Sequence, residues 1–523
     1  MNKKLQNLLL VVLAAVMMSF GWMELTGLVM LGGLVPLLIL AARYDRSRRS
    51  FWKMAGWTTL FITLWYALTI WWVWHSTPAG PIAATFFAYI FTGLPFMLWF
   101  YVSKRAPKAL SYTVLVSVWM VGEWVYNWNQ ASFPWLNIGN GFASDIPLVQ
   151  WYEWTGVYGG TLWVLATNIL IYEFLIVRRP RNWLPPVLTA VVPPLVSVVM
   201  FLAYSEPQRT AKITIVQPNI DAYQKFGDLS QEQQTANLVD LMSRAPADAD
   251  FIVMPETAID EGLTEGRLAN SQSIREIRRV AEERYPGAMV IVGATTYRFY
   301  GADKKSKTAR GNDESGYYDV YNTALAIDPA GKIDLHHKSK LVIGVEMMPD
   351  WWWVKYLGDL VVDLGGTSGQ LGYDTVRKVF DNGGVHAAAG ICYESIYGQY
   401  YTEFVQNGAE VMFIITNDGW WKDTPGYRQH FNYARLRAVE TRRAIARSAN
   451  TGKSGFIDTR GDVIETLGWD ERGAITDDVP LNRKTTLYVR FGDYLSRISL
   501  LVWGLAMLYF IAYRIRKKDH IVK

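Results

Sequence analysis

The chain has 523 residues, of which 50% are hydrophobic and 19% charged, and it contains 23 Trp, 29 Tyr and 22 Phe. This composition excludes a disordered or fibrous protein, because such chains lack the apolar residues that build a packed core. The formal net charge is +5 and the mean hydropathy is +0.06, which is too high for an ordinary soluble enzyme and too low for membrane spans alone. The sequence therefore predicts membrane spans combined with a water-soluble part.

Eight apolar stretches have about the 20 residues that a helix needs to cross a bilayer. They cover about residues 6–22, 25–42, 55–74, 83–103, 109–128, 158–177, 184–204 and 494–513. The first stretch is short and also fits the apolar part of a signal peptide, although no small-residue cleavage pattern follows it. We predict seven spans, a globular segment and one further span.

The charges of the connecting loops predict the orientation of these spans. Lys and Arg gather after spans two, four, six and eight, whereas the short loops after spans one, three and five contain neither. Because positive loops stay in the cytoplasm, both termini are expected there and residues 206–493 on the opposite face, the periplasm of a bacterium. We expect a transmembrane domain at 1–205, a catalytic domain at 206–493 and a C-terminal helix with a cytoplasmic tail at 494–523. This pattern explains the basic net charge without a nucleic-acid partner.

The globular segment alternates β-rich runs with polar helical stretches. The runs are 212–220, 249–257, 288–296, 323–331, 385–394, 410–418 and 454–462. Helices are expected at 230–245, 271–284 and 427–448, and an exposed loop at 300–315. Such alternation is typical of an α/β domain with a buried sheet.

Three ionisable residues stand where apolar runs stop: Glu256, Lys338 and Cys392, the single cysteine. A thiol becomes a strong nucleophile as thiolate, so a carboxylate that takes its proton and an ammonium that stabilises the oxyanion would make it reactive. Each residue also has an ordinary structural interpretation: a small buried thiol, a helix N-terminal carboxylate or a solvated lysine. No metal-ligand spacing is found among the six histidines, so we expect neither a metal nor an organic cofactor.

Several motifs resemble the nitrilase superfamily and, within it, the apolipoprotein N-acyltransferase family. These motifs are PET at 255–257, the eight-residue spacing from Lys338 to Glu346, GICYE at 390–394, NDGWW at 417–421, FPWLN at 133–137 and the segment 434–461. The resemblance implies an αββα sandwich fused to an eight-span membrane domain. It also implies transfer of a fatty acyl chain from a phospholipid, phosphatidylethanolamine, to the N-terminal amine of a diacylglyceryl apolipoprotein by a monomeric enzyme.

The resemblance also assigns roles to individual residues. Cys392 corresponds to the nucleophile, Glu256 to the general base and Lys338 to the oxyanion-stabilising lysine. Supporting positions are Glu346, Glu394 and Tyr393, and expected substrate contacts are Trp420, Asn417, Trp135 and Trp151. For the two last tryptophans, anchoring at the lipid interface is an open alternative.

The chain departs from the family at 341–346, where it has LVIGVE, and Lys340 competes with Lys338 for the lysine role.

Two other functions stay open at this stage. A membrane-tethered amidase or nitrile hydrolase would keep the same three residues and deliver water to the thioester. A transporter or scaffold would use the globular segment only to bind a ligand. An intramembrane Asp, Lys or Arg pathway is not evident, although Glu173 near the end of span six is a candidate exception.

Overall fold

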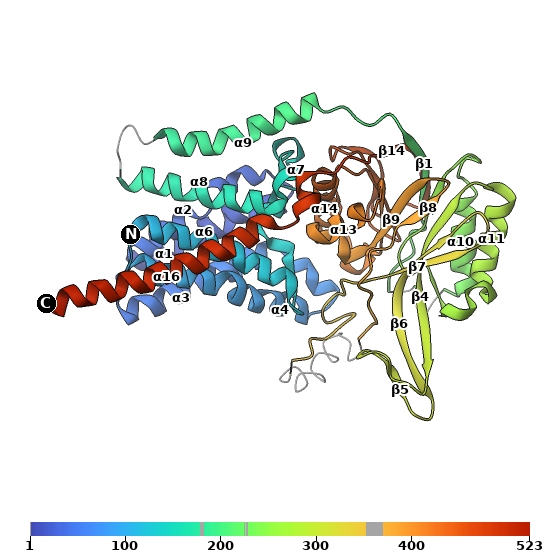
Figure 1. The fold of residues 1–523 in the computed structure, drawn as a ribbon, viewed down its shortest axis with the longest axis horizontal. Coiled ribbons are helices and arrows are strands. Elements are labelled where there is room, and N and C mark those ends of the chain that lie inside the picture. Colours follow the sequence, from blue (N-terminus) through green and yellow to red (C-terminus); the bar gives the residue numbers. More distant parts are fainter. Residues whose placement is uncertain (1, 178–182, 224, 226–228, 352–369, 523) are drawn as a thin grey trace. The chain divides into compact units, whose positions relative to one another are not determined.

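The computed structural model describes residues 2–177, 183–223, 225, 229–351 and 370–522 (Figure 1). It divides into two compact units. The first comprises Met1–Val73, Gly80–Ala203 and Phe491–Lys523, and the second Trp74–Ala79 and Tyr204–Arg490. The basic residues Arg178, Arg179 and Arg181, used above for the orientation, lie outside the described residues.

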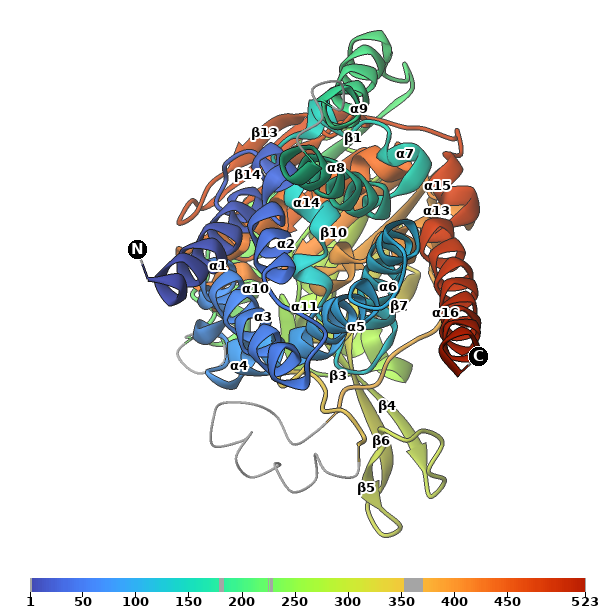
Figure 2. The same cartoon turned by 90° about the vertical axis from the view of Figure 1, so that its left-hand side faces the viewer.

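The first unit is helical. Its main helices are α1 (Lys3–Ser19), α2 (Val35–Ala42), α3 (Arg48–Thr69), α4 (Ala79–Ala88), α5 (Leu94–Ser103), α6 (Lys108–Trp128), α8 (Val157–Val177), α9 (Leu184–Ala203) and α16 (Tyr494–Val522). Helix α1 packs on α3, and α6 packs on both α5 and α16, as Figure 2 shows.

Six helices of the described residues are long and apolar enough to cross a membrane. They are Lys3–Trp22, Ala79–Ser103, Lys108–Trp128, Val157–Ile176, Leu184–Ala203 and Tyr494–Lys517. The apolar helix Gly27–Ala42 is shorter. The expectation of several apolar helices is confirmed, whereas the number of eight spans stays a prediction.

The segment after α6 is a compact, buried structure of short 3₁₀ turns at Pro134–Leu136, Ile138–Phe142 and Ile146–Leu148. The carboxylate of Glu123 in α6 anchors it, accepting hydrogen bonds from the Ile138 amide at 2.9 Å and the Thr161 hydroxyl at 2.7 Å. Glu123 is 4% exposed and is a buried acidic residue of a candidate membrane helix that the sequence analysis missed. Its hydrogen bonds within the unit give it a structural role, because a buried carboxylate is stabilised by such donors.

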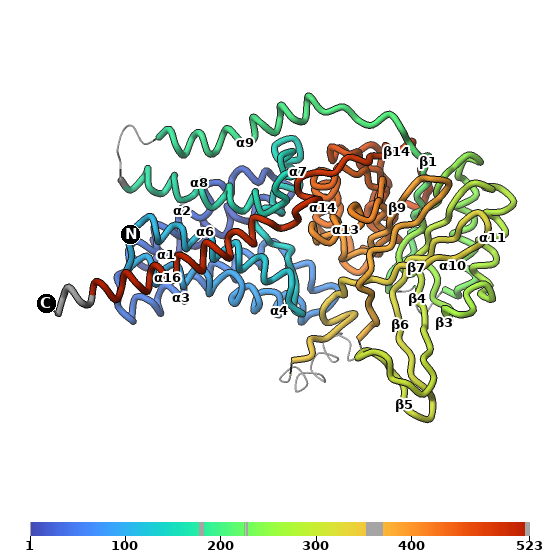
Figure 3. Tube along the Cα trace, viewed as in Figure 1, coloured from blue at the N-terminus to red at the C-terminus, as the bar shows by residue number. Residues whose placement is uncertain are grey.

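The second unit contains two sheets (Figures 1 and 3). The larger has the order β14-β1-β2-β4-β6-β5, with β3 paired to β4 and β7 to β6, and the smaller has the order β13-β12-β11-β10-β9-β8. Strands of the larger sheet are β1 (Thr210–Gln217), β2 (Phe251–Val253), β3 (Ile259–Thr264), β4 (Met289–Gly301), β5 (Arg310–Asn312), β6 (Gly316–Ile327), β7 (Ile333–His337) and β14 (Gly473–Pro480). Those of the smaller are β8 (Phe380–Asn382), β9 (Val385–Ile391), β10 (Val411–Thr416), β11 (Ile445–Ala449), β12 (Ser454–Ile457) and β13 (Val463–Leu467).

Apolar side chains from both sheets share one core, in which Phe251 of β2 meets Phe413 of β10 at 5.2 Å between ring centroids. Helices α10 (Gln231–Met242) and α11 (Gln272–Arg284) pack with strands of the larger sheet in a second core. Helices α13 (Gly398–Gln406) and α14 (Pro425–Thr441) lie on the other side of the smaller sheet (Figure 1). The predicted αββα sandwich is thus the architecture of this unit.

Two sequence-based expectations about this unit are wrong in part. The helix expected at 427–448 ends at Thr441, because Arg442 adopts left-handed φ of 49° and Ile445–Ala449 forms β11, a buried strand between β10 and β12. The loop expected at 300–315 contains the short strand β5, which pairs with β6 at the end of a long hairpin.

Candidate active site

Three strand ends bring the predicted residues together. Glu256 follows β2, Lys338 follows β7 and Cys392 follows β9. Their exposed fractions are 5%, 1% and 8%, so all three are buried. Cys392 directly follows the apolar strand β9, and Glu256 is the third residue after the buried strand β2. Lys338 directly follows β7, whose two last residues, His336 and His337, are buried.

An ion cluster forms around the lysine. Lys338 Nζ lies 3.0 Å from Glu256 Oε1 and 2.8 Å from Glu346 Oε1. Asn322 of β6 donates from Nδ2 to the same two oxygens, at 2.7 and 3.1 Å. The second oxygen of Glu256 accepts the backbone N–H of Asn417 at 3.0 Å. The Glu256 carboxylate is therefore held by three donors and has a fixed orientation.

The ammonium of Lys338 stays charged despite its burial. Burial by itself lowers the pKa of Lys338, but the negative charges of Glu256 and Glu346 outweigh it and hold that pKa well above its ordinary value. Lys340 takes a different direction, with its ammonium 4.8 Å from the centroid of the Tyr397 ring. Of the two candidate lysines, Lys338 is therefore the one that pairs with Glu256 and Glu346.

The thiol of Cys392 sits in an unusual setting. Its backbone has a φ of 48°, a left-handed value that a non-glycine residue adopts only when its surroundings enforce it. Burial raises the pKa of the Cys392 thiol, and the charge of Glu256 raises it further, while Lys338 acts in the opposite direction. The thiol is therefore protonated at neutral pH, and its attack on a carbonyl needs a base that removes the proton.

Glu394 ties together the strand ends that carry Cys392 and Lys338. Its carboxylate accepts the N–H of Ile391 at 2.8 Å and that of Ser339 at 2.6 Å. Burial opposes its ionisation, but the charge of His336 and hydrogen bonds from His336, the Ile391 amide and the Tyr400 hydroxyl outweigh burial and lower the pKa of Glu394. A charged, fully buried Glu394 thus fixes the spacing between the thiol and the ammonium.

The loop that departs from the family pattern still delivers its glutamate. Gly344 has a φ of 80° and supplies a left-handed turn. Glu346 then reaches back, so that its Oε2 accepts the N–H of Val342 at 2.8 Å while its Oε1 meets Lys338. The Glu346 carboxylate thus belongs to the ion cluster.

A second polar network supports the backbone of Cys392, and the sequence analysis missed it. His430 Nε2 lies 3.2 Å from the Cys392 carbonyl oxygen, and His430 Nδ1 lies 2.8 Å from Arg447 Nη2. Burial and the charge of Arg447 lower the pKa of His430, so the ring is neutral. The same ring lies against two further side chains, with Nδ1 3.0 Å from Asp418 Oδ1 and Nε2 2.8 Å from the Ser395 hydroxyl. Arg447 also binds Asp418 at 2.9 Å.

The arginines of the segment around α14 are buried and bonded inside the unit. Arg437 pairs with Glu440 at 2.9 Å, and Arg443 donates to the Ala409 carbonyl at 2.7 Å. Together with Arg442 and Arg447 they are at most 3% exposed. Structural bonding, rather than a solvated face, accounts for these four positions.

The remaining predicted residues fall in different places. Trp420 contacts Tyr223 at 5.4 Å between ring centroids, and Tyr393 meets Tyr397 at 5.5 Å, both in the second unit. Trp135 and Trp151 belong to the first unit, where they are 1% and 8% exposed among other aromatic rings. Their assignment as substrate contacts stays a prediction.

Residues 212–487 match the family model of the carbon-nitrogen hydrolases. The chain belongs to the carbon-nitrogen hydrolase family. Residues 10–170 of this family member match the model of the apolipoprotein N-acyltransferase N-terminal domain. The predicted resemblance is thereby confirmed for both parts of the chain.

Curated relatives of this carbon-nitrogen hydrolase cover both units. The apolipoprotein N-acyltransferase of Chlorobaculum tepidum is 28% identical over 491 residues, which are 91% of this chain and 90% of that protein. The apolipoprotein N-acyltransferase of Allorhizobium ampelinum is 32% identical over 372 residues, 69% of this chain and 65% of that protein.

Proposed function

We propose that this protein transfers a fatty acyl chain from a phospholipid to the N-terminal amine of a diacylglyceryl apolipoprotein, through a thioester on Cys392. The observation that carries the proposal is the buried cluster of Glu256 and Lys338 beside the Cys392 thiol. The apolar helices and the match of both family models support a lipid substrate.

In the first half-reaction, Cys392 Sγ attacks the ester carbonyl of the phospholipid while Glu256 takes the thiol proton. Lys338 and a backbone N–H stabilise the oxyanion, which typically contributes about 3–4 kcal/mol per donor to the transition state. The carbon–oxygen bond then breaks, and Glu256 returns its proton to the leaving lysophospholipid oxygen. An acyl-thioester remains on Cys392.

In the second half-reaction, the amine of the apolipoprotein attacks the thioester. Glu256 takes a proton from the amine, the carbon–sulfur bond breaks, and the thiolate is reprotonated as the amide forms. Transfer proceeds without ATP because an amide is more stable than a thioester. These steps use only groups of this chain and its substrates.

The membrane part has a physical reason in this proposal. Moving an acyl chain into water costs about 0.8 kcal/mol per CH₂, so the enzyme has to meet both lipid substrates at the bilayer. We propose membrane spans at 1–205 and 494–523, a periplasmic catalytic domain at 206–493, phosphatidylethanolamine as donor and a monomeric enzyme.

Intact mass spectrometry of the purified protein tests the proposal. After incubation with phosphatidylethanolamine, we expect a fatty-acyl mass on Cys392, which disappears when a diacylated lipopeptide is added and becomes acylated. Cys392→Ala and Cys392→Ser should form no adduct, and Glu256→Gln should form it at least about a hundredfold more slowly.

Two outcomes would contradict the proposal. If Glu256→Gln formed the acyl adduct at the wild-type rate, the Glu256 carboxylate would not be the base. Release of free fatty acid, with the lipopeptide left unmodified, would favour the hydrolase that delivers water to the thioester.

A further inference from the structure

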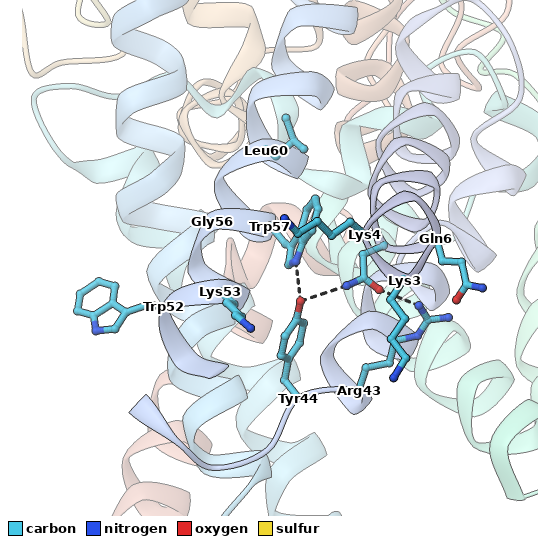
Figure 4. Close-up of a pocket in the computed structure, with 11 residues that line it drawn as sticks. Lys3, Lys4, Gln6, Arg43, Tyr44, Trp52, Lys53, Gly56, Trp57 and Leu60 are labelled. Atoms are coloured by element: carbon cyan, nitrogen blue, oxygen red, sulfur yellow. Dashed lines mark hydrogen bonds between the residues drawn. The ribbon is translucent and has the colours of Figure 1, made fainter. Parts of the chain in front are cut away.

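A basic cavity in the first unit has no part in the proposed acyl transfer. Its volume is about 1030 Å³, and it lies between the start of α1, the end of α2 and the first turns of α3 (Figure 4). Four cationic side chains line it: Lys3, Lys4, Arg43 and Lys53. Its described lining contains no carboxylate.

A directed chain of hydrogen bonds organises one wall of the cavity. Arg43 Nη1 donates to Asn7 Oδ1 at 2.7 Å, and Asn7 Nδ2 donates to the hydroxyl oxygen of Tyr44 at 3.1 Å. Trp57 Nε1 donates to the same oxygen at 2.7 Å. Arginine and indole N–H groups can only donate, so they fix the direction of the whole chain.

This direction leaves the hydroxyl of Tyr44 as a double acceptor. Its own proton has no acceptor among the described residues that contact it, and Arg43 retains further N–H groups after bonding Asn7. The wall therefore presents the Tyr44 proton and the remaining Arg43 N–H groups as donors at the cavity. Such a surface matches a ligand made of acceptor oxygens, such as a phosphate.

Among the described residues, none of the four cavity cations forms an ion pair with a carboxylate, whereas Lys108 of the same unit pairs with Glu173 at 2.9 Å. In a second, smaller basic cavity of about 370 Å³, Lys104 donates to the Ala41 carbonyl at 2.8 Å and Arg105 to that of Arg46 at 2.9 Å. Cationic groups of the smaller cavity are thus bonded to backbone carbonyls of the protein, whereas Lys3, Lys4 and Lys53 of the larger cavity have no such bond among the described residues.

Apolar surface next to the cavity points to a lipid. Trp52, which lines it, is 62% exposed, and Trp57 and Leu60 of α3 line it as well. Tryptophan settles at the headgroup level of a bilayer, and basic pockets at the ends of membrane helices suit anionic headgroups. A lipid whose phosphate is held in this cavity would have the apolar side chains of Trp52 and Leu60 beside its acyl chains.

We propose that this cavity binds the headgroup of an anionic phospholipid, with its phosphate oxygens on Arg43, Lys53 and the hydroxyl of Tyr44. Four cations favour a lipid with two phosphates, such as diphosphatidylglycerol, over one with a single phosphate. This bound lipid is distinct from the proposed acyl donor, and the site does not depend on the proposed reaction.

Native mass spectrometry of the full-length protein in detergent tests the site. Diphosphatidylglycerol and the zwitterionic phosphatidylethanolamine are titrated against the wild type and the double variant Arg43→Gln with Lys53→Gln. We expect the variant to bind diphosphatidylglycerol roughly tenfold to thirtyfold more weakly, because each cation near a headgroup contributes to binding. Phosphatidylethanolamine binding should not change.

The matched control is Arg48→Gln with Arg49→Gln, which removes two exposed cations of α3 outside the cavity lining. Equal loss of binding in this control, or none in the cavity variant, would overturn the proposal. Displacement of the lipid by an equal concentration of glycerol 3-phosphate would also overturn it, since the ligand would then be a free phosphate ester. Tyr44→Phe provides a second variant that keeps all charges, and we expect a severalfold loss of diphosphatidylglycerol binding.

Discussion

The Cys392 thiol and the Glu256 carboxylate influence each other in two opposite ways. As a proposed base, Glu256 activates the thiol, but as a nearby negative charge it raises the thiol pKa above the value that burial already sets. These two effects have different signs in a Glu256→Gln variant. That difference separates the base from a merely structural carboxylate.

Alkylation of Cys392 measures the second effect directly. Because its pKa is raised, the thiolate fraction stays low at neutral pH, so the iodoacetamide rate should still rise steeply at about pH 9.5–10, where an ordinary thiol with a pKa of about 8.5 has nearly levelled off. Removing the negative charge in Glu256→Gln lowers the pKa, so alkylation at a given pH should become faster although acyl transfer is lost. The rate is followed by intact mass from pH 7 to 10, and a half-maximal rate near pH 8.5 with a plateau by about pH 9.5 in the wild type would contradict the raised pKa.

Some residues of the candidate site could be predicted from the sequence, and others could be found only in the structure. Glu256, Lys338 and Cys392 stand at the ends of apolar runs, so strand patterning and the motifs were sufficient to name them. Asn322 lies in β6, one residue before the predicted run 323–331, and only the pairing of strands brings its amide to 2.7 Å from Glu256, which is 66 positions away. The same holds for His430, whose contact with Cys392 depends on the packing of α14.

At the scale of elements, β4 sets the position of the turn that carries Glu256. The N–H of Gly293 in β4 donates to the Pro255 carbonyl at 3.1 Å. A Cβ at Gly293 would lie 2.5 Å from the Cα of Glu256 and 2.6 Å from the Pro255 oxygen. Such distances are too short, so this strand can approach the turn only with a glycine at that position.

Gly293→Ala should therefore displace Glu256 from Lys338 and Asn322. We expect acyl-thioester formation to fall at least about tenfold and the thermal stability to drop, since overpacking costs about 1–3 kcal/mol. Gly287→Ala in the same unit is the control, because its added Cβ meets nothing within 4 Å. Wild-type kinetics in Gly293→Ala would show that the close contact does not position Glu256.

The elements themselves were predicted best where local signals are strong. Helix α10 begins at a capping box formed by Ser230 and Gln233, and α11 has Ser271 as its N-cap. The predicted helix 427–448 was too long, because the residues of Arg442–Ser448 are themselves compatible with a helix. Its change of direction at Arg442 and the pairing of β11 with β10 and β12 are long-range effects that no local pattern contains.

For the whole molecule, helix bounds explain why the number of spans is harder to predict than their presence. Helix α3 begins at Arg48 and ends at Thr69, so it includes charged residues that the apolar window 55–74 leaves out. The stretch 25–42 divides into a 3₁₀ helix, Gly27–Gly32, and α2. Sequence hydropathy detects apolar content, whereas the length of each helix depends on where packing bends the chain.

The proposed reaction requires the second unit on the periplasmic side and both termini in the cytoplasm. In a Cys392→Ala background, which removes the single cysteine, Lys305→Cys in the exposed β4–β6 hairpin and Arg516→Cys in α16 provide one probe on each side. A membrane-impermeant maleimide should label Cys at 305 in intact spheroplasts, but Cys at 516 only after permeabilisation, because the charged loops orient the spans. Labelling of position 516 alone in intact spheroplasts would place the thiol cluster in the cytoplasm and exclude periplasmic acyl transfer.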